Sequence, residues 1–349
     1  MSTSNFYDSV NITQLHRFTD IIDVRSPIEF AIDHIPNARN CPVLSDLERN
    51  QIGAIYKTSP FLARKLGSAY VAQHISQLIK EDFVQYDRNW KPLVYCWRGG
   101  LRSRALTITM NQIGWKACQL TGGYKTYRKS VLDTLTQLPQ HFTFRVICGP
   151  TGSGKSLLLK ALAQLNAQIV DLEELAKHRG SVLGLLGDAI QPTQRWFDSV
   201  LLEALKKFNP SHPIFIEAES KRIGKICLPD SLYQLMHQSQ CIFLEAPINE
   251  RVNFLLKTYR FFIDHPIDLR KKLAHLTPIN GHATIEKWQT LIRYKKFDKL
   301  VRELLVTHYD KLYQKSLGKH YQQIDQAQHI FLPNIHQETI DQIALTLTK

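Results

Sequence analysis

The chain has few cysteines, and none of them is arranged as a pair. Its six cysteines, at positions 41, 96, 118, 148, 227 and 241, form no Cys-x-x-Cys motif and no metal-ligand spacing. This pattern argues against structural zinc and against a disulfide framework. No apolar run reaches the ~18 residues that span a bilayer, and the polar residues 1–11 do not have the form of a signal peptide. We therefore expect a reduced, cytoplasmic protein without a membrane segment.

Acidic residues are scarce in one part of the chain. Residues 251–320 hold 15 Lys and Arg against 6 Asp and Glu, whereas residues 141–250 hold 11 of each kind. The whole chain has a formal net charge of +13. A basic lobe is typical of a protein that binds a polyanion such as RNA, but a solvated basic helical surface has the same composition. Charge alone leaves both interpretations open.

Length and composition predict two globular α/β domains. The chain has 349 residues, of which 44% are hydrophobic and 21% charged, enough for two separate cores. We predict a first domain over residues 1–138, with a helical insertion at about 44–85. The boundary falls near Pro139–Phe142. The second domain then covers 142–349, and its basic helical region covers about 251–320.

A cysteine in the first domain lies between a predicted strand and a predicted helix. The apolar run Leu93-Val94-Tyr95 ends at Cys96, Trp97-Arg98-Gly99-Gly100-Leu101-Arg102-Ser103 follows, and residues 105–113 read as a helix. In such a loop the backbone N–H groups turn inward and form an anion-binding cup. We expect Cys96 to be held there as a nucleophilic thiolate, stabilised by Arg98 and Arg102. The alternative is a buried cysteine that packs as a small hydrophobe.

The motifs around this loop resemble a rhodanese (sulfurtransferase) domain. In order they are Asp23-Val24-Arg25, Glu29-Phe30, His34-Ile35-Pro36-Asn37-Ala38, the Cys96 loop and Leu120-Thr121-Gly122-Gly123-Tyr124. The alternation of strands and helices predicts a small parallel sheet, and we expect Asp23 and Arg25 to form a structural ion pair. One departure is that five residues, instead of the usual four, separate the cysteine from the closing arginine. That is also the spacing of cysteine-dependent phosphatases, and a wider cup suits a phosphate or a selenium-bearing group.

The second domain opens with a phosphate-binding loop. The strand-like Phe144-Arg145-Val146-Ile147-Cys148 leads into Gly149-Pro150-Thr151-Gly152-Ser153-Gly154-Lys155-Ser156, and a helix is predicted over 157–165. This is a complete Gly-x-x-x-x-Gly-Lys-Ser motif in the strand–loop–helix context that a P-loop requires. We expect Gly149, Gly152, Ser153 and Gly154 to present N–H groups to a diphosphate. Lys155 would neutralise its terminal phosphate, and Ser156 would bind Mg²⁺.

Further polar residues follow predicted strands of the second domain. Asp171 and Glu217 end apolar runs, and either carboxylate could position the metal or serve only in a strand-end ion pair. We expect Arg179, in His178-Arg179-Gly180-Ser181, and Arg222, in Glu219-Ser220-Lys221-Arg222-Ile223-Gly224, to contact phosphate. Aromatic residues lie among the cations of the basic region, a mixture that suits stacking on unpaired bases.

Taken together, the two halves resemble the tRNA 2-selenouridine synthase family. The resemblance rests on Asp23-Val24-Arg25-Ser26-Pro27, Gly53-Ala54-Ile55-Tyr56-Lys57, Cys96–Ser103, Gly149–Ser156, His178–Ser181 and Glu219–Gly224, and extends nearly from end to end. Leu101 and Ala218 are local departures that remove no chemical group. The resemblance implies replacement of sulfur by selenium in 2-thiouridine at the wobble position of tRNA. It further implies selenophosphate as selenium donor, an S-geranyl intermediate made with geranyl diphosphate, and selenium carried on Cys96.

The residues by themselves leave other functions open. One alternative is a sulfurtransferase coupled to an ATP-dependent small-molecule kinase, and another is a cysteine-dependent phosphatase. A third is a nucleotide-gated RNA-binding protein with an inert rhodanese domain. For partners we expect tRNA, a monomeric chain and no membrane, with a selenophosphate-supplying enzyme as a further candidate.

Overall fold

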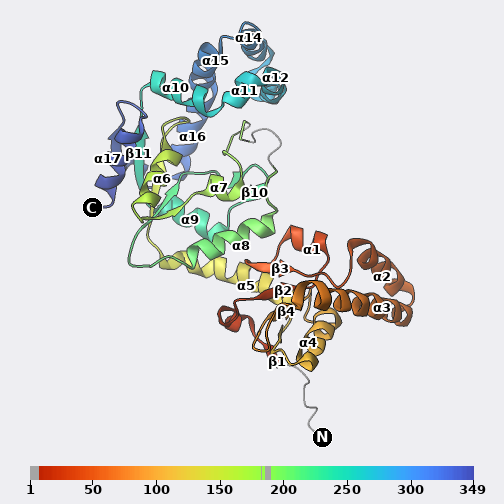
Figure 1. Ribbon diagram of the computed structural model, residues 1–349. Helices are drawn as coiled ribbons and strands as arrows, with labels where there is room; N and C mark the ends of the chain where they lie inside the picture. Colours follow the sequence, from red (N-terminus) through yellow and green to blue (C-terminus); the bar gives the residue numbers. More distant parts are fainter. Residues whose placement is uncertain (1–7, 182, 185–189) are drawn as a thin grey trace. The chain divides into compact units, whose positions relative to one another are not determined.

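The computed structural model describes residues 8–181, 183–184 and 190–349. It divides into two compact units, which Figure 1 shows in ribbon form. The first consists of Met1–Thr134 with Asp198–Glu203, and the second of Leu135–Phe197 with Ala204–Lys349. This division runs through helix α5 (Gly123–Gln137), slightly before the predicted boundary at 139–142. Strand β6 (Phe144–Cys148) is the first strand of the second unit.

The first unit is built on a five-stranded parallel sheet with the order β1-β5-β4-β2-β3. Its strands are β1 (Asp8–Val10), β2 (Ile21–Asp23), β3 (Ala38–Asn40), β4 (Leu93–Tyr95) and β5 (Cys118–Leu120). The three inner strands β5, β4 and β2 are buried at every residue. Helices cover both faces of a parallel sheet of this kind, and this explains the continuous apolar runs.

Helices connect the strands of the first unit. They are η1 (Ile12–Arg17), α1 (Pro27–Ile32), α2 (Asp46–Thr58), α3 (Pro60–Leu78), η2 (Ile79–Phe83) and α4 (Leu101–Ile113). Helix α5 follows the strand β5, and η3 (Leu138–His141) lies at the start of the second unit. The predicted helical insertion is confirmed as α2 and α3, which pack against each other. Ser45 caps α2 through the Glu48 N–H, and Pro60 begins α3 where its missing N–H costs nothing.

The second unit has a five-stranded parallel sheet with the order β12-β11-β6-β8-β7. Its other strands are β7 (Gln168–Val170), β8 (Ile214–Glu217), β11 (Gln240–Glu245) and β12 (Gln328–Phe331), and β9 (Arg222–Ile223) and β10 (Ile226–Cys227) form a separate hairpin. Helices α6 (Lys155–Gln164) and α17 (Gln337–Leu347) pack together, and both contribute to one core cluster with the sheet residues Ile147, Phe215 and Ile242.

A helical lobe follows strand β11. It consists of α10 (Ile248–Thr258), α11 (Arg260–Asp264), α12 (Pro266–Ala274), α13 (Thr277–Asn280), α14 (His282–Arg293), α15 (Phe297–Leu304), η4 (Leu305–Tyr309) and α16 (Asp310–His320). Its core centres on the fully buried Trp288 and includes Phe262, Leu269 and Leu300. Most aromatic residues of the basic region thus serve as helix core.

The remaining elements are α7 (Leu172–Ala176), α9 (Asp230–Gln238) and η5 (Ile324–Gln326) of the second unit, and α8 (Gln194–Leu205), whose residues Asp198–Glu203 belong to the first unit. Among the described helices, none combines the length and apolar character that crossing a membrane requires. The predicted fold class, a small parallel α/β domain followed by a P-loop α/β domain with a basic helical part, is confirmed. The edge strands β1 and β12 were not predicted, because their residues are mostly exposed and do not form the continuous apolar run that marks the buried strands.

Candidate active site

The Cys96 thiol lies at the end of β4 and directly before α4. Its sulfur is buried and accepts hydrogen bonds from the Gly100 N–H, at 3.2 Å, and from the Ser103 hydroxyl, at 3.1 Å. The Gln119 amide donates to the Ser103 hydroxyl oxygen at 2.7 Å, and the hydroxyl proton has two acceptors within reach, the Cys96 sulfur at 3.1 Å and the Gly100 carbonyl at 3.3 Å. Two hydrogen-bond donors, one from the backbone and one from a side chain, therefore converge on the Cys96 sulfur.

The turn after β5 holds this loop in place. The N–H groups of Tyr124 and Lys125 donate to the carbonyls of Cys96 and Trp97, each at 2.9 Å. Gly123 has φ of +57°, and a Cβ there would lie 2.2 Å from the Cys96 carbonyl oxygen. Only glycine lets the two backbones approach so closely. The two glycines at 122–123 therefore belong to the thiol site although they lie far from Cys96 in the sequence.

An ion pair and Tyr124 support the strand ends behind the loop. Arg25 and Asp23 are fully buried and pair at 2.5 Å, so the predicted structural ion pair is confirmed. The guanidinium of Arg25 lies 4.0 Å from the Tyr124 ring centroid, and the Tyr124 hydroxyl donates to Asp33 at 2.7 Å. A buried arginine needs this full set of partners because removing one would leave an uncompensated charge.

The two predicted arginines of the thiol loop have different surroundings. Arg98 is exposed, whereas Arg102 pairs with Glu29 on α1 at 2.8 Å. Burial opposes ionisation of Glu29, but the hydrogen bond and charge of Arg102 outweigh it and lower the pKa of that carboxyl. The hydrogen bonds to Cys96 therefore come from Gly100 and Ser103, and a direct role of Arg98 and Arg102 in holding an anion stays a prediction.

The P-loop joins β6 to α6. Lys155 donates to the Gly149 carbonyl at 2.8 Å, and the N–H of Gly149 donates to the Tyr313 hydroxyl oxygen at 2.6 Å. Ser153 is fully buried, and its hydroxyl has no hydrogen-bond partner among the described residues. Helix α6 begins at Lys155, so its unpaired N–H groups point into the loop, where they favour an anion.

The helical lobe forms a hydrogen bond with the P-loop. Arg251 on α10 donates to the Thr151 carbonyl at 2.9 Å and forms two hydrogen bonds with Asp310 on α16, at 2.6 and 3.0 Å. Arg251 is 5% exposed, so the pair is shielded from water. The roles of Arg251, Asp310 and Tyr313 could not be predicted from the sequence, because each contact joins residues that are distant in the chain.

Three glutamates lie beside the P-loop. Oxygen atoms of Glu173, Glu217 and Glu219 lie within 4.8 Å of one another, and the Ser156 hydroxyl is 3.4 Å from Glu173. One Glu217 oxygen accepts from the Glu173 N–H at 3.0 Å, and the other is buried without a partner among the described residues. Carboxylate and hydroxyl oxygens are the ligands that Mg²⁺ prefers. The donor set fits the predicted metal at Ser156, with Glu173, Glu217 and Glu219 as the residues that would hold it. Asp171 instead caps α7 through the Glu174 N–H.

The proximity of the three acids raises their pKa values. Burial and the negative charge of Glu173 raise the pKa of Glu219 to about 8, and burial raises that of Glu217 well above its ordinary value. A carboxyl whose folded pKa exceeds its unfolded value binds more protons in the folded state. Stability must then fall as pH rises from about 4.5 toward 8.

We expect Glu219→Gln to flatten this pH dependence. Without divalent cations, the unfolding temperature of the full chain should fall less between pH 5 and pH 8.5 in the variant than in wild type, since one of three crowded charges is gone. Thermal unfolding at a series of pH values measures the difference between the two profiles. Glu338→Gln, on α17, is the matched control. Parallel profiles for wild type and Glu219→Gln would contradict the expectation.

A cavity of about 1070 Å³ opens beside the P-loop. Residues Gly152–Ser156, Glu173 and Glu219 line it, together with the loop at 178–181. Arg179 is among the lining residues, and its guanidinium lies 5.1 Å from the Tyr259 ring centroid. Arg222 is not brought together with them, because it is exposed on the β9–β10 hairpin. Its contact with phosphate stays a prediction that this geometry does not favour.

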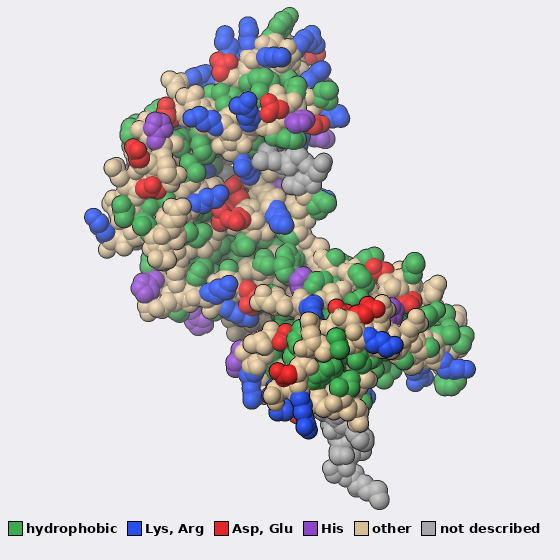
Figure 2. Space-filling view, in the orientation of Figure 1, with side chains coloured by type: hydrophobic (Ala, Val, Ile, Leu, Met, Phe, Trp, Pro, Cys, Tyr) green, Lys and Arg blue, Asp and Glu red, His purple; other side chains and the backbone are tan. Residues whose placement is uncertain are grey.

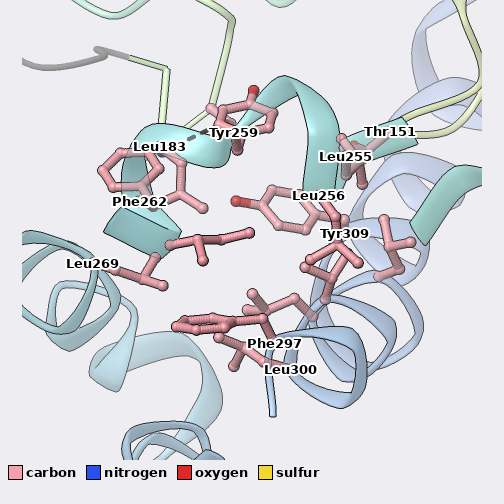
Figure 3. Close-up of a pocket in the computed structure, with 15 residues that line it drawn as sticks. Thr151, Leu183, Leu255, Leu256, Tyr259, Phe262, Leu269, Phe297, Leu300 and Tyr309 are labelled. Atoms are coloured by element: carbon pink, nitrogen blue, oxygen red, sulfur yellow. Dashed lines mark hydrogen bonds between the residues drawn. The ribbon is translucent and has the colours of Figure 1, made fainter. Parts of the chain in front are cut away.

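An apolar pocket adjoins this cavity (Figure 3). Thr151 of the P-loop lies at one end, and Phe262, Leu269, Phe297 and Leu300 of the lobe lie away from it. The pocket and the cavity adjoin, because five residues line both; they are Thr151, Ser181, Leu255, Tyr259 and Tyr309. A phosphate-binding loop beside an apolar pocket suits an amphiphilic ligand with an anionic head. The pocket could not be predicted from the sequence, because the residues that line it have the apolar pattern of an ordinary helix core.

Known proteins resemble this chain over both units. The model of the tRNA 2-selenouridine synthase AAA domain matches residues 142–267, and that of the rhodanese-like domain matches residues 8–130. A tRNA 2-selenouridine synthase of Nitrosomonas europaea is 33% identical over 80% of this chain and 74% of its own. One of Nitrosomonas eutropha is 31% identical over 83% of this chain and 76% of its own.

Among solved structures, the N-terminal domain of a putative ATP/GTP binding protein from Clostridium difficile 630 is 32% identical. It covers 36% of this chain and 99% of its own, with a TM-score of 0.33. The identity and coverage of the Nitrosomonas proteins establish the relationship, and the same two parts occur here in the same order. This chain belongs to the tRNA 2-selenouridine synthase family.

Proposed function

We propose that this protein is a tRNA-modifying enzyme that replaces sulfur by selenium in 2-thiouridine at the wobble position. The observation that carries the proposal is the combination of a hydrogen-bonded thiol in one unit with a phosphate loop that adjoins an apolar pocket in the other. A rhodanese-like unit alone would be expected to transfer sulfur, and a P-loop unit alone would be expected to bind a nucleotide. The apolar pocket favours a ligand that has a diphosphate and a hydrocarbon chain.

Geranyl diphosphate is the ligand that we propose for the second unit. Its diphosphate would accept hydrogen bonds from the N–H groups of the P-loop and from the Lys155 ammonium. Its hydrocarbon chain would enter the pocket past Thr151. Glu173, Glu217 and Glu219 with Ser156 would hold Mg²⁺, which supplies positive charge against the diphosphate. The thiocarbonyl sulfur of the nucleoside then attacks C1 of the geranyl group, the C–O bond breaks and diphosphate leaves.

Alkylation makes the later exchange feasible. A thiocarbonyl sulfur is a poor leaving group, whereas geranylthiolate departs when selenium attacks C2 of the base and the C2–S bond breaks. We propose selenophosphate as the selenium source: its selenium forms the bond to C2 as geranylthiolate leaves, and water then breaks the P–Se bond and releases phosphate. We propose that the selenium-bearing group is held at Cys96 during this exchange. The Gly100 N–H and the Ser103 hydroxyl, which now donate to Cys96 sulfur, would stabilise the negative charge of the selenium-bearing group.

The proposal is tested by mass analysis of tRNA nucleosides. The full chain is incubated with 2-thiouridine-bearing tRNA and Mg²⁺, with geranyl diphosphate alone or together with selenophosphate. We expect S-geranyl-2-thiouridine in the first reaction and 2-selenouridine in the second. Unchanged 2-thiouridine in both, together with ATP turnover in the absence of tRNA, would overturn the proposal in favour of a coupled kinase. Hydrolysis of p-nitrophenyl phosphate by Cys96 would instead favour a phosphatase.

Filling the apolar pocket should weaken binding of the hydrocarbon chain. Leu256 is a half-buried residue that lines the pocket, so Leu256→Trp occupies space that the geranyl chain would take. Because each buried CH₂ contributes ~0.8 kcal/mol, we expect affinity for geranyl diphosphate to fall by roughly tenfold or more. Affinity for inorganic diphosphate should not change.

Calorimetric titration with the two ligands measures this difference. Val306→Trp is the control, since Val306 is exposed on the same lobe and does not line the pocket. Equal loss of affinity for both ligands in Leu256→Trp would mean that the substitution disturbs the P-loop. If wild type bound geranyl diphosphate and inorganic diphosphate with equal affinity, the apolar pocket would not bind the hydrocarbon chain, contrary to the proposal.

A further inference from the structure

The turn between α2 and α3 exposes an unusual group of apolar side chains. Tyr56 in the last turn of α2 is 57% exposed, and Phe61 in the first turn of α3 is 70% exposed. Leu62 and Leu66 follow on α3 and are also exposed. The opposite side of α3 packs into the core of the first unit through Ile75 and Leu78. The exposed rings are therefore not required to hold the hairpin onto the sheet.

The same segment contains no acidic residue. Between Glu48 and Glu81 the chain has five Lys and Arg and no Asp or Glu. Three of these cations, Lys57, Arg64 and Lys65, are exposed and adjoin the two rings in sequence, and the Lys65 ammonium lies 5.8 Å from the Phe61 ring centroid. Figure 2 shows hydrophobic and basic side chains next to one another over α2 and α3.

We propose that this turn binds an unpaired loop of the substrate tRNA. Tyr56 and Phe61 offer faces on which bases stack, while Lys57, Arg64 and Lys65 neutralise the phosphates on either side. The inference rests on the proposed function, and it adds an RNA-binding surface to the unit that holds Cys96. We define Tyr56, Lys57, Phe61, Arg64 and Lys65 as the hairpin surface.

The charges favour RNA over a protein partner. Lysine is depleted at the centre of protein–protein interfaces, whereas here two lysines flank two aromatic rings. A purely apolar patch would suit another protein, but an apolar patch in a segment, residues 49–80, that has cations and no acidic residue suits a polyanion. The side chains thus combine the two features of single-strand binding sites, a basic track and stacking platforms.

Two variants separate these features. Tyr56→Ala/Phe61→Ala removes the rings and Lys57→Ala/Arg64→Ala/Lys65→Ala removes the cations. Dissociation constants for full-length 2-thiouridine tRNA are measured at several salt concentrations. Loss of the rings should weaken binding by ~5–150-fold per stacked base with little change in salt dependence. Loss of the cations should weaken binding and lower the slope of log Kd against log salt by about 3.

Matched controls come from the same unit. Lys91→Ala/Lys116→Ala/Lys129→Ala removes three other exposed cations, and Ile113→Ala removes an exposed apolar side chain on α4. The controls should bind tRNA as wild type does. Unchanged thermal unfolding and unchanged affinity for geranyl diphosphate show that the hairpin variants are folded.

The outcomes distinguish this inference from the proposed function. If wild type modifies tRNA but both hairpin variants bind tRNA with wild-type affinity and salt slope, the inference is overturned and the proposed function stands. The inference is also overturned if the variants keep tRNA binding and lose association with a selenophosphate-supplying protein, because the hairpin surface would then bind that protein instead of tRNA. If wild type binds tRNA through this surface but never modifies it, the proposed function alone fails.

Discussion

Replacing Cys96 with serine should abolish selenium incorporation while S-geranyl-2-thiouridine accumulates. Serine keeps the shape of the loop and can accept the hydrogen bonds from Gly100 and Ser103, but its hydroxyl is neither readily ionised nor able to carry selenium. We expect the rate of 2-selenouridine formation to fall by on the order of 10³-fold or more, as is typical when a nucleophile is removed. Geranylation should proceed at the wild-type rate, since the P-loop unit is unaltered.

Mass analysis of nucleosides over time measures both products. Cys227→Ser is the control, because Cys227 is an exposed cysteine on the β9–β10 hairpin. Wild-type selenation by Cys96→Ser would show that the thiol is only a packed side chain and that the rhodanese-like unit is inert. Loss of both products would place Cys96 in tRNA binding or folding instead.

Replacing Lys155 with alanine should block the earlier step and leave 2-thiouridine unchanged. In the structure the Lys155 ammonium donates to the Gly149 carbonyl within the P-loop, and a bound diphosphate would replace that weak acceptor with a charged one. Losing a hydrogen bond to a charged group costs ~1.5–3 kcal/mol, so affinity for geranyl diphosphate should fall by roughly 10–150-fold. Neither geranylated nor selenated nucleoside should form at limiting geranyl diphosphate.

The matched variant is Lys207→Ala, which removes an exposed cation after α8. It should bind geranyl diphosphate and modify tRNA as wild type does. Supplying tRNA that already bears S-geranyl-2-thiouridine should restore 2-selenouridine formation by Lys155→Ala. Failure of that rescue would mean that the P-loop also serves selenium transfer, contrary to the separate roles proposed for the two units.

Several parts of the two sites could be predicted because each is continuous in sequence. Cys96 and Ser103 lie within one strand–loop–helix segment, and Gly149–Ser156 lie within another. Backbone conformation over eight residues is set largely by local sterics and by glycine positions, so such motifs indicate their own shape. The ion pair of Asp23 with Arg25 was predictable for the same reason, since only Val24 separates them in the chain.

Partners of long charged side chains could not be predicted. Arg102 was expected at the thiol, yet it pairs with Glu29, which lies 73 residues away in the sequence. Arg222 was expected at the phosphate site, yet the hairpin that bears it leaves it exposed. A flexible cation pairs with whichever carboxylate the fold brings near, and a motif that contains only the cation does not reveal that carboxylate.

The sequence alone determined that this protein joins a thiol loop to a P-loop, because both motifs are local and each dictates its own backbone. Only the tertiary structure decided what surrounds them. Glu173, Glu217 and Glu219 meet because α7 and the end of β8 converge beside the P-loop. The apolar pocket exists because α10, α11, α12 and α15 leave space between their inner faces. Both features depend on packing between segments distant in the chain, which no local pattern of residues specifies.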